Sequence, residues 1–360
     1  MDIKAYIEHY LHTYTPYKTY WNYEDGCVLE GCVDLYRATG DKVYRDFVLQ
    51  YLEQRVLADG SIPTFDTTKY SIDSINCGKV LFFALDETGD ERYRKAIELH
   101  VERLKTHPRC ACGNYWHKEN YPDQIWLDGL YMAQPFRMMY EARFNGMAQL
   151  HDITRQFRNV RKYLWNGDKG LNYHAYDEAK RQSWCDKETG CSHNFWLRST
   201  GWYLMALIDC IESCPEMLYE HYRALVDLFR ESMRGVLRYQ DAQSKLFYQV
   251  IDRADMQGNY METSGSAMIA YSLMKAVRLG VMNGEKYLPG AREMFEALVA
   301  QKLVMHDGTA ELTDICKVAG LSDTRDGSVQ YYLSEPRVSD DSKGVGPFMM
   351  AWAEYLRGTK

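Results

Sequence analysis

The sequence predicts an all-α protein, an (α/α)6 barrel in which six helical hairpins close into a toroid, with short β-hairpins in the long loops. Three observations support this fold class: a motif that recurs along the chain, twelve segments with helical spacing of apolar residues, and loops that alternate between short and long. Six hairpins can close on themselves, whereas a linear array leaves both ends uncovered. We therefore expect one domain over residues 1–360, although this length would allow roughly two or three.

The recurring motif is the junction between two helices. Ala-Thr-Gly-Asp-Lys-Val-Tyr-Arg (38–45) recurs 49 residues later as Glu-Thr-Gly-Asp-Glu-Arg-Tyr-Arg (87–94), and a weaker copy lies at 279–287. Glycine adopts the left-handed conformation that ends many helices, and the aspartate after it is a good cap for the next helix. A motif repeated at this period is typical of helical hairpins packed side by side.

Apolar residues recur with a helical period along most of the chain. The expected helices, in order, are 2–14, 22–38, 42–57, 70–86, 91–106, 124–143, 147–164, 195–213, 217–238, 263–279, 284–302 and 345–357. Pro122 closes the loop before the helix at 124, with Asp123 as its expected N-cap. Thr263-Ser264-Gly265-Ser266 is most simply a helix cap before Ala267.

The loops between these helices are of two kinds. Short ones such as Ala-Thr-Gly-Asp alternate with long loops rich in glycine and aromatic residues, which are 58–69, 108–123, 165–193, 240–262 and 303–344. Short loops on one side and long loops on the other predict a toroid with a single functional face. Within the long loops, 170–176 and 245–250 alternate apolar and polar residues, and we expect them to form small β-hairpins around the mouth.

Composition narrows the function classes. The 29 Tyr, 12 Phe and 8 Trp supply many flat apolar faces with a polar edge, which suit sugar rings. The net charge of −7 argues against a nucleic-acid partner and against a polybasic membrane surface. The chain contains no phosphate-binding loop, no dinucleotide-binding glycine motif, no His-Glu-x-x-His and no Gly-x-Ser-x-Gly.

The N-terminal residues and the cysteines both bear on the cellular location of the protein. Charges at Asp2, Lys4 and Glu8 interrupt the apolar stretch that a signal peptide needs, and no segment reaches the length of a membrane span. The ten cysteines are too sparse for a disulfide scaffold, which favours reduced thiols and a cytoplasmic protein. Cys110-Ala-Cys112 is the only close pair and the only hint of a metal site.

The richest candidate site is the segment from Asn114 to Met132, which holds Trp116-His117-Lys118 and Trp126-Leu-Asp128-Gly. Asp128 is expected in the first turns of a helix, where apolar neighbours favour its protonated form and the helix N-terminus favours its charged form. Opposed influences suit a group that gives and takes a proton, although an ordinary helix-start residue has the same pattern.

Two further clusters stand at predicted helix starts. Asp73 opens the helix near residue 70, so two carboxylates would converge on the mouth and permit acid and base roles. Trp196 and Trp202 flank Arg198, whose planar guanidinium can pair with a carboxylate in two hydrogen bonds. Core tryptophans beside an arginine of purely structural role are the alternative.

These motifs, taken in order, resemble those of the unsaturated rhamnogalacturonyl hydrolases of glycoside hydrolase family 105, over nearly the whole chain. The matching motifs are Trp21-Asn-Tyr23-Glu-Asp-Gly, Ile72-Asp73, Asn76-Cys-Gly78, Trp116-His117-Lys118, Gln124-Ile-Trp126-Leu-Asp128-Gly-Leu-Tyr-Met132, His174, Trp196-Leu-Arg198, Gly201-Trp202, Glu262-Thr-Ser-Gly-Ser-Ala-Met268 and Lys343-Gly-Val-Gly-Pro-Phe348. One departure is Ser199-Thr200, where many relatives have Gly-Asn, and it bears on substrate detail.

The resemblance implies a hydrolase that removes a 4,5-unsaturated galacturonic acid from the end of a rhamnogalacturonan oligosaccharide, a product of pectin degradation. By this resemblance Asp128 protonates C4 and activates water for C5, and Asp73 is the second carboxylate. The implied substrate-binding residues are Tyr23, His117, Lys118, Trp126, His174, Trp196, Arg198 and Trp202. No metal or cofactor is needed for this chemistry, and we expect a monomer or a weak homo-oligomer.

Other functions remain open at this stage. An unsaturated glucuronyl hydrolase would share the barrel and the chemistry, but a sulfated substrate calls for extra basic residues, and 303–344 holds only four. A sugar epimerase would use a pair of histidines, for which His117 and His174 are the candidates. A sugar-binding protein without catalysis would have little use for Asp128.

Overall fold

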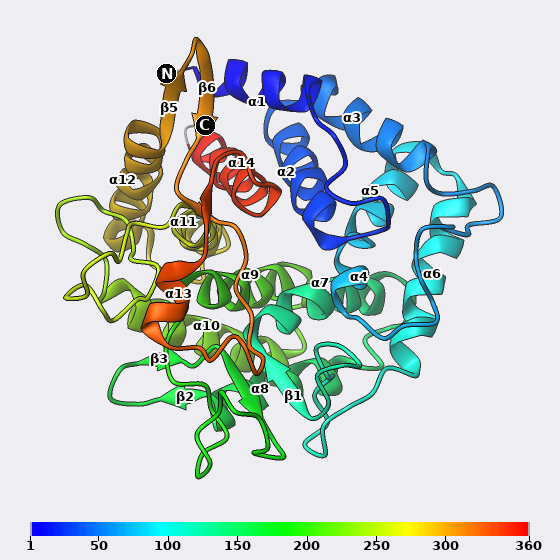
Figure 1. The fold of residues 1–360 in the computed structure, drawn as a ribbon. Helices are drawn as coiled ribbons and strands as arrows, with labels where there is room; N and C mark the ends of the chain where they lie inside the picture. Colours follow the sequence, from blue (N-terminus) through cyan, green and yellow to red (C-terminus); the bar gives the residue numbers. More distant parts are fainter. Residues whose placement is uncertain (1, 359–360) are drawn as a thin grey trace.

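The computed structural model describes residues 2–358 and is a ring of helices in two concentric layers (Figure 1). The inner helices are α2 (Tyr23–Thr39), α4 (Asp73–Asn76) followed by α5 (Lys79–Thr88), α7 (Leu127–Phe144), α9 (Leu197–Ser213), α11 (Thr263–Arg278) and α14 (Ser342–Arg357). The outer helices are α1 (Ile3–His12), α3 (Lys42–Glu53), α6 (Glu91–Lys105), α8 (Leu150–Tyr163), α10 (Tyr219–Leu237) and α12 (Gly284–Lys302). Inner helices pack successively around the ring, which closes where α14 packs along α2, so the predicted fold class is confirmed.

The two layers differ in their patterns of burial. The outer helix α8 buries Leu150, Ile153, Phe157 and Val160, which recur every three or four residues and form one apolar stripe. Inner helices such as α9 are instead buried along nearly their whole surface, because they contact an outer helix and two inner neighbours. Each inner helix begins after a long loop, and each except α14, the last helix, leads through a short one to an outer helix. All of them therefore begin at the same end of the ring, which we call the mouth.

The recurring junction motif behaves as its residues predict. Gly40 and Gly89 have φ angles of 75° and 66° and end α2 and α5 in the left-handed conformation. The side chains of Asp41 and Asp90 then accept hydrogen bonds from the backbone N–H of Val43 and Arg92 and cap α3 and α6. These short junctions lie at the end of the ring away from the mouth.

Several predicted helix starts are wrong by three residues: α8 begins at Leu150 and not at 147, α14 begins at Ser342 and not at 345, and two further errors lie at the site. The helix expected from residue 70 begins at Asp73, because residues 70–72 pair with the backbone of 117–119 and cannot also be helical. Asp123 does not cap the helix that holds Asp128; it has a φ of 61°, and its carboxylate accepts a hydrogen bond from Arg181. Trp126 precedes that helix without a side-chain cap.

Short strands near the mouth form four antiparallel pairs. They are β1 (Gln124–Trp126) with β4 (Ala175–Asp177), β2 (Trp165–Asn166) with β3 (Leu171–Asn172), β5 (Leu303–His306) with β6 (Thr309–Leu312), and β7 (Ile315–Cys316) with β8 (Arg337–Val338). The segment 170–176 therefore supplies two strands to different pairs and is not a hairpin of its own. Residues 245–250 form only single bridges, in which Tyr248 faces Met261 and Val250 faces Trp196.

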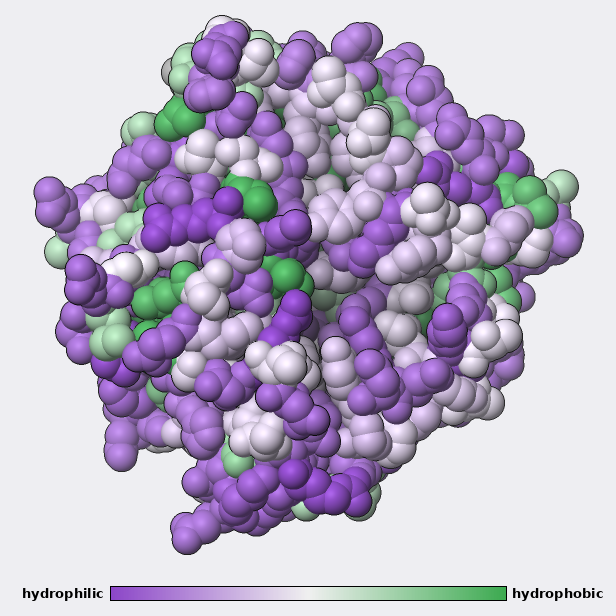
Figure 2. All heavy atoms as spheres, in the orientation of Figure 1, coloured by the Kyte–Doolittle hydropathy of each residue, from purple (hydrophilic) through white to green (hydrophobic). Residues whose placement is uncertain are grey.

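The segment after α12 was expected to be a plain loop, but it contains β5 to β8 and the short helix α13 (Val329–Ser334), which lies in front of the ring (Figure 1). Figure 2 shows the same face covered mainly by hydrophilic residues, with hydrophobic residues in small scattered patches. Among residues 2–358, no helix is both long enough and apolar enough to cross a membrane.

Candidate active site

Asp128 and His174 are brought together by the pairing of β1 with β4. Trp126 lies opposite Ala175, and the backbone N–H of Leu127 donates to the carbonyl of His174 at 3.1 Å. Asp128 follows in the first turn of α7, with its Oδ2 3.2 Å from Nε2 of His174 but without the alignment of a hydrogen bond. No other residue in 2–358 donates a hydrogen bond to this carboxylate.

The orientation of His174 depends on α13. Its ring is fully buried, and Nδ1 lies 2.8 Å from the hydroxyl of Tyr332. When that hydroxyl donates to Nδ1, the proton of the neutral ring resides on Nε2 and faces Asp128. Tyr332 was not among the predicted site residues, because nothing in its sequence surroundings indicates that it folds back onto β4.

Asp73 lies beside His117 and Lys118 for a similar reason. The N–H of Ile72 donates to the carbonyl of His117 at 3.2 Å, so the start of α4 lies against the loop before β1. Lys118 Nζ is 2.7 Å and His117 Nε2 is 3.4 Å from the Asp73 carboxylate. Burial alone would raise the pKa of Asp73, but the charge of Lys118 and the ring of His117 hold it below its usual value. Asp73 is therefore ionised at neutral pH.

His117 stands between the two carboxylates. Its ring stacks on Trp126 with centroids 5.0 Å apart and an interplanar angle of 7°. Burial lowers the pKa of His117, while both Asp73 and Asp128 act to raise it, so the ring senses both charges. Gly129 makes this packing possible, because a Cβ there would lie 3.2 Å from His117 Nδ1 and 2.7 Å from Cδ1 of Ile72.

The predicted tryptophans occupy two layers. Trp126 and Trp196 flank His174, with ring centroids 5.2 Å and 4.9 Å from the imidazole. Trp202 lies deeper in the barrel, stacked on Tyr131 at 4.7 Å. Tyr23 contacts Trp202 edge to face at 6.4 Å and so connects this deeper layer to α2.

Arg198 is almost completely enclosed, with 1% of its surface exposed. Its guanidinium carbon lies 5.0 Å from the centroid of the Trp196 ring, and Nη1 donates to Ser264 Oγ at 3.3 Å. Burial alone would lower the pKa of Arg198, but Cys316, Glu262 and other nearby groups raise it above the usual value. Nη2 is buried and has no acceptor within the described residues, so it is free to donate to an oxygen of a bound ligand.

A cavity of about 400 Å³ opens next to Asp73. Its lining consists of Lys18, Tyr20, Trp21, Asn22, Tyr23, Glu24, Thr64, Asp66, Lys69, Ser71, Asp73, Ser74 and Lys118. Of the predicted site residues, Asp73, Tyr23 and Lys118 line this cavity and the other seven lie outside its lining.

Sequence reasoning did not identify Lys18, Tyr20 or Glu24 as residues of the cavity. A usable signal was present, because the segment before α2 places a tyrosine at every third position from Tyr14 to Tyr23. This segment contributes both aromatic faces and charge to the cavity, with Lys18 Nζ 2.5 Å from Glu24 Oε1.

The one cysteine pair singled out in the sequence has a carboxylate beside it. Potential ligand atoms of Cys110, Cys112 and Glu178 lie within 4.8 Å of one another. The Glu178 carboxylate accepts the backbone N–H of Ala111 at 2.6 Å and that of Cys112 at 3.0 Å, and so fixes this loop to the end of β4. All ten cysteines are free thiols.

Comparison with known proteins identifies the family. Residues 2–359 match the model of Glycosyl Hydrolase Family 88. A family 105 glycoside hydrolase of C. acetobutylicum is 40% identical and superimposes with a TM-score of 0.94, covering 99% of each chain. The 24.9 kDa protein in the picA locus of Rhizobium radiobacter is 40% identical over 233 residues, which are 62% of this chain and 98% of that protein.

More distant relatives share the fold. The unsaturated glucuronyl hydrolase of Bacillus sp. GL1 is 16% identical, with a TM-score of 0.67, over 94% of this chain and 87% of that one. The chain therefore belongs to the glycoside hydrolases of family 88, with family 105 enzymes among its structural relatives. The family resemblance expected from the sequence motifs is confirmed.

Proposed function

We propose that the protein removes a 4,5-unsaturated galacturonic acid from the non-reducing end of rhamnogalacturonan oligosaccharides, leaving rhamnose at the new end. This proposal rests mainly on the surroundings of the Asp128 carboxylate. Its carboxylate accepts no hydrogen bond from the described residues, yet it faces the buried imidazole of His174 at 3.2 Å. A carboxyl group with free oxygens beside a second proton carrier suits a general acid that is later a base.

The proposed reaction is a hydration of the C4=C5 double bond. Asp128 gives its proton to C4, which leaves positive charge shared by C5 and the ring oxygen. The resulting carboxylate accepts a proton from water as the water oxygen bonds to C5. The hemiketal formed in this way opens, and the rearranged sugar separates from the aglycone. Asp128 regains its proton in each cycle, so one carboxyl serves as acid and base.

The other residues have roles that follow from their surroundings. Asp73 is held ionised by Lys118 and so accepts hydrogen bonds from sugar hydroxyl groups without competing for the proton transfer. Arg198 offers its unpaired Nη2 to the uronate carboxylate. His117 and Trp126 form a flat stack behind the sugar ring.

The cavity beside Asp73 supports a neutral sugar next to the uronate. Each lysine in its lining is already paired with a carboxylate: Lys118 with Asp73 at 2.7 Å, Lys18 with Glu24 at 2.5 Å, and Lys69 with Asp66 at 3.6 Å. A sulfated glycosaminoglycan calls for an excess of positive charge, whereas the three lysines of this lining are balanced by its three carboxylates. Tyr20, which is 53% exposed, offers an aromatic face to an apolar sugar surface such as that of rhamnose.

The decisive experiment follows the ultraviolet absorbance of the double bond. We expect the protein to abolish this absorbance faster with an unsaturated galacturonosyl-rhamnose disaccharide than with an unsaturated glucuronyl disaccharide from a glycosaminoglycan. Asp128→Asn should lower kcat by about 10²- to 10⁴-fold. Asp123→Asn is the matched control, since that carboxylate lies in the same segment and pairs with Arg181.

Three outcomes would contradict this proposal. Faster turnover of the glucuronyl substrate would reassign the specificity, and near-normal activity of Asp128→Asn would remove Asp128 from the chemistry. Sugar binding without any loss of absorbance in the unmodified protein would indicate a sugar-binding protein without catalysis.

A further inference from the structure

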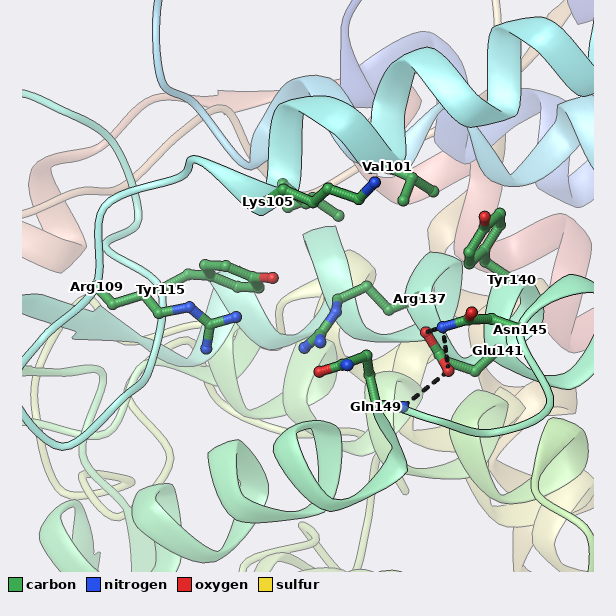
Figure 3. Close-up of a pocket in the computed structure, with 10 residues that line it drawn as sticks. Val101, Lys105, Arg109, Tyr115, Arg137, Tyr140, Glu141, Asn145 and Gln149 are labelled. Carbon is green, nitrogen blue, oxygen red and sulfur yellow. Dashed lines mark hydrogen bonds between the residues drawn. The ribbon is translucent and has the colours of Figure 1, made fainter.

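A second cavity, of about 450 Å³, lies on the outside of the ring between α6 and α8, with α7 behind it (Figure 3). Its lining consists of Val101, Leu104, Lys105, Arg109, Tyr115, Arg137, Tyr140, Glu141, Asn145 and Gln149. None of the predicted site residues is among them. Figure 3 shows side chains from α6, from α7, from the loop after α6 and from the loop between α7 and α8 directed toward one space.

Arg137 is the central residue of this cavity. Its side chain is 9% exposed and extends from α7 between the two outer helices. Only Nη1 has partners, the carboxylate of Asp152 at 2.8 Å and the amide oxygen of Gln134 at 3.1 Å. Within the described residues Nη2 has no acceptor, so a buried guanidinium retains a donor toward the cavity.

Positively charged side chains outnumber carboxylates around Arg137. Asp152 lies against Arg137, Arg109 and Arg155, so one negative charge faces three positive ones. Burial would raise the pKa of Asp152, but Arg137 and Arg109 lower it to about 2. Lys105 is a fourth cation. Its Nζ lies 2.5 Å from Oε1 of Glu102, a residue outside the cavity lining.

Glu141 supplies a carboxylate to the lining, and its oxygens are hydrogen-bonded within the protein. Its oxygens accept both the side-chain amide of Asn145, at 2.9 Å and 3.0 Å, and the backbone N–H of Gln149 at 2.9 Å. Two aromatic rings complete the walls: Tyr115, 4.0 Å from the Arg109 guanidinium carbon, and Tyr140 on α7. The lining thus combines cations for an anionic group, amides for hydroxyl groups and flat rings for an apolar sugar face.

We propose that this cavity is a binding site for a small anionic sugar, separate from the site of catalysis. A carboxylate or phosphate group of the sugar binds Arg137 and Lys105, and the ring lies between Tyr115 and Tyr140. Cavities of this size fall within the range of about 300–1,000 Å³ that holds small ligands. Lys118 and His117 follow Tyr115 closely in sequence, but their side chains face Asp73 and do not line this cavity.

The test measures binding to the full chain by titration calorimetry with galacturonate, glucose 6-phosphate and rhamnose. Galacturonate lacks the C4=C5 bond and is not consumed. Val101→Phe fills the cavity from α6 without removing a polar contact, and we expect it to remove one binding site for the anionic sugar while kcat/KM at the catalytic site is unchanged. Lys105→Gln, a change of an exposed side chain, should weaken the same site about threefold to fivefold.

Lys95→Gln is the matched control, since Lys95 lies on the exposed face of the same helix and outside the cavity. Binding of galacturonate alone identifies a sugar acid as the ligand, and binding of glucose 6-phosphate alone identifies a sugar phosphate; either result supports the proposal. Equal binding of rhamnose, or unchanged stoichiometry and affinity in both Val101→Phe and Lys105→Gln, overturns it.

Discussion

Asp73 and Asp128 stand in the first turns of neighbouring inner helices, but their surroundings differ. Asp73 is paired with Lys118 and contacts His117, and its pKa is held low. Asp128 has no cationic lysine or arginine within ion-pair distance among the described residues, and only His174 faces it. Asp73 is thus held in its charged form by its neighbours, and Asp128 lacks such a cation.

Removing the charge of Lys118 should alter the pH dependence of activity. In Lys118→Met the largest charge that opposes the effect of burial on Asp73 is lost, so its pKa rises. The pKa of His117 also rises, because the repulsion between Lys118 and the protonated ring is lost. Both groups then bind protons at higher pH than before, and the acid limb of the kcat/KM profile moves upward. The profile is measured with the disaccharide substrate between pH 4 and about pH 8, the range in which His titrates.

Lys69→Met is the matched control for this experiment, because Lys69 lines the same cavity but pairs with Asp66, 3.6 Å away. An acid limb that stays in place in Lys118→Met, or that moves equally in Lys69→Met, would show that Lys118 does not set the charge of Asp73.

The residue identities at the site were largely predictable, but their partners were not. Sequence motifs placed Asp128 at a helix start, as the structure has it, and Arg198 between two tryptophans, of which the guanidinium packs on Trp196 while Trp202 stacks on Tyr131. Asp128 lies beside His174 only because β1 pairs with β4, and this pairing joins segments far apart in the chain. No local pattern encodes such a pairing, because each strand has only three residues.

At the scale of elements, glycines set how closely the inner helices approach. A Cβ at Gly346 of α14 would lie 2.4 Å from the carbonyl oxygen of Cys27 in α2, and one at Gly201 of α9 would lie 2.7 Å from the sulfur of Met268 in α11. Backbone atoms cannot move aside as a side chain can, so the α2–α14 contact that closes the ring has the strictest requirement for glycine.

Gly346→Ala is therefore expected to destabilise the fold. Displacing α14 from α2 should cost about 1–3 kcal/mol of unfolding free energy, measured by urea denaturation. Gly290→Ala in the outer helix α12 is the control, because a Cβ there meets no atom within 4 Å. That substitution should stabilise the protein by about 0.5–1 kcal/mol through the lower entropy of the unfolded chain. Equal effects of the two substitutions would contradict the packing argument.

The helical elements followed from local signals, and the exceptions have tertiary causes. Junctions of the Thr-Gly-Asp type fixed the ends of α2, α3, α5 and α6, because glycine and aspartate act within a few residues. The start of α4 was misplaced, since residues 70–72 bond to 117–119 in place of the first helical turn. The strands of 303–344 escaped notice because each is four residues or fewer.

At the scale of the whole molecule, stability depends on buried neutral histidines. His100 has no exposed surface, and it accepts a hydrogen bond from Trp21 Nε1 at 3.0 Å, with its Nδ1 2.7 Å from the Ala96 carbonyl oxygen. Burial lowers its pKa to about 4, although the Ala96 carbonyl acts to raise it. His107 has a pKa of about 4, also because of burial. Both rings are neutral in the folded protein above that pH.

Unfolding free energy should therefore fall as the pH drops from about 6.5, the ordinary pKa of histidine, toward 4. In this window the unfolded chain binds protons at His100 and His107 and the folded protein does not, so acid favours unfolding. Each histidine contributes up to about 1.4 kcal/mol per pH unit. Denaturation at several pH values measures this slope.

His100→Gln should remove one histidine's share of the slope, whatever its effect on stability at neutral pH. His306→Gln, at an exposed position in the β5–β6 hairpin, is the control. A slope that is the same in His100→Gln as in the unmodified protein would show that His100 does not titrate on unfolding.

The sequence by itself determined the helical hairpins, their junctions and the residues available for chemistry, because caps, glycines and apolar spacing act over a few positions. Only the tertiary structure decided that Lys118 neutralises Asp73, that Tyr332 orients His174 beside Asp128, and that three arginines gather around Asp152 on the outer face. These contacts join segments distant in the chain, and their energies depend on burial and distance, which exist only once the ring has closed.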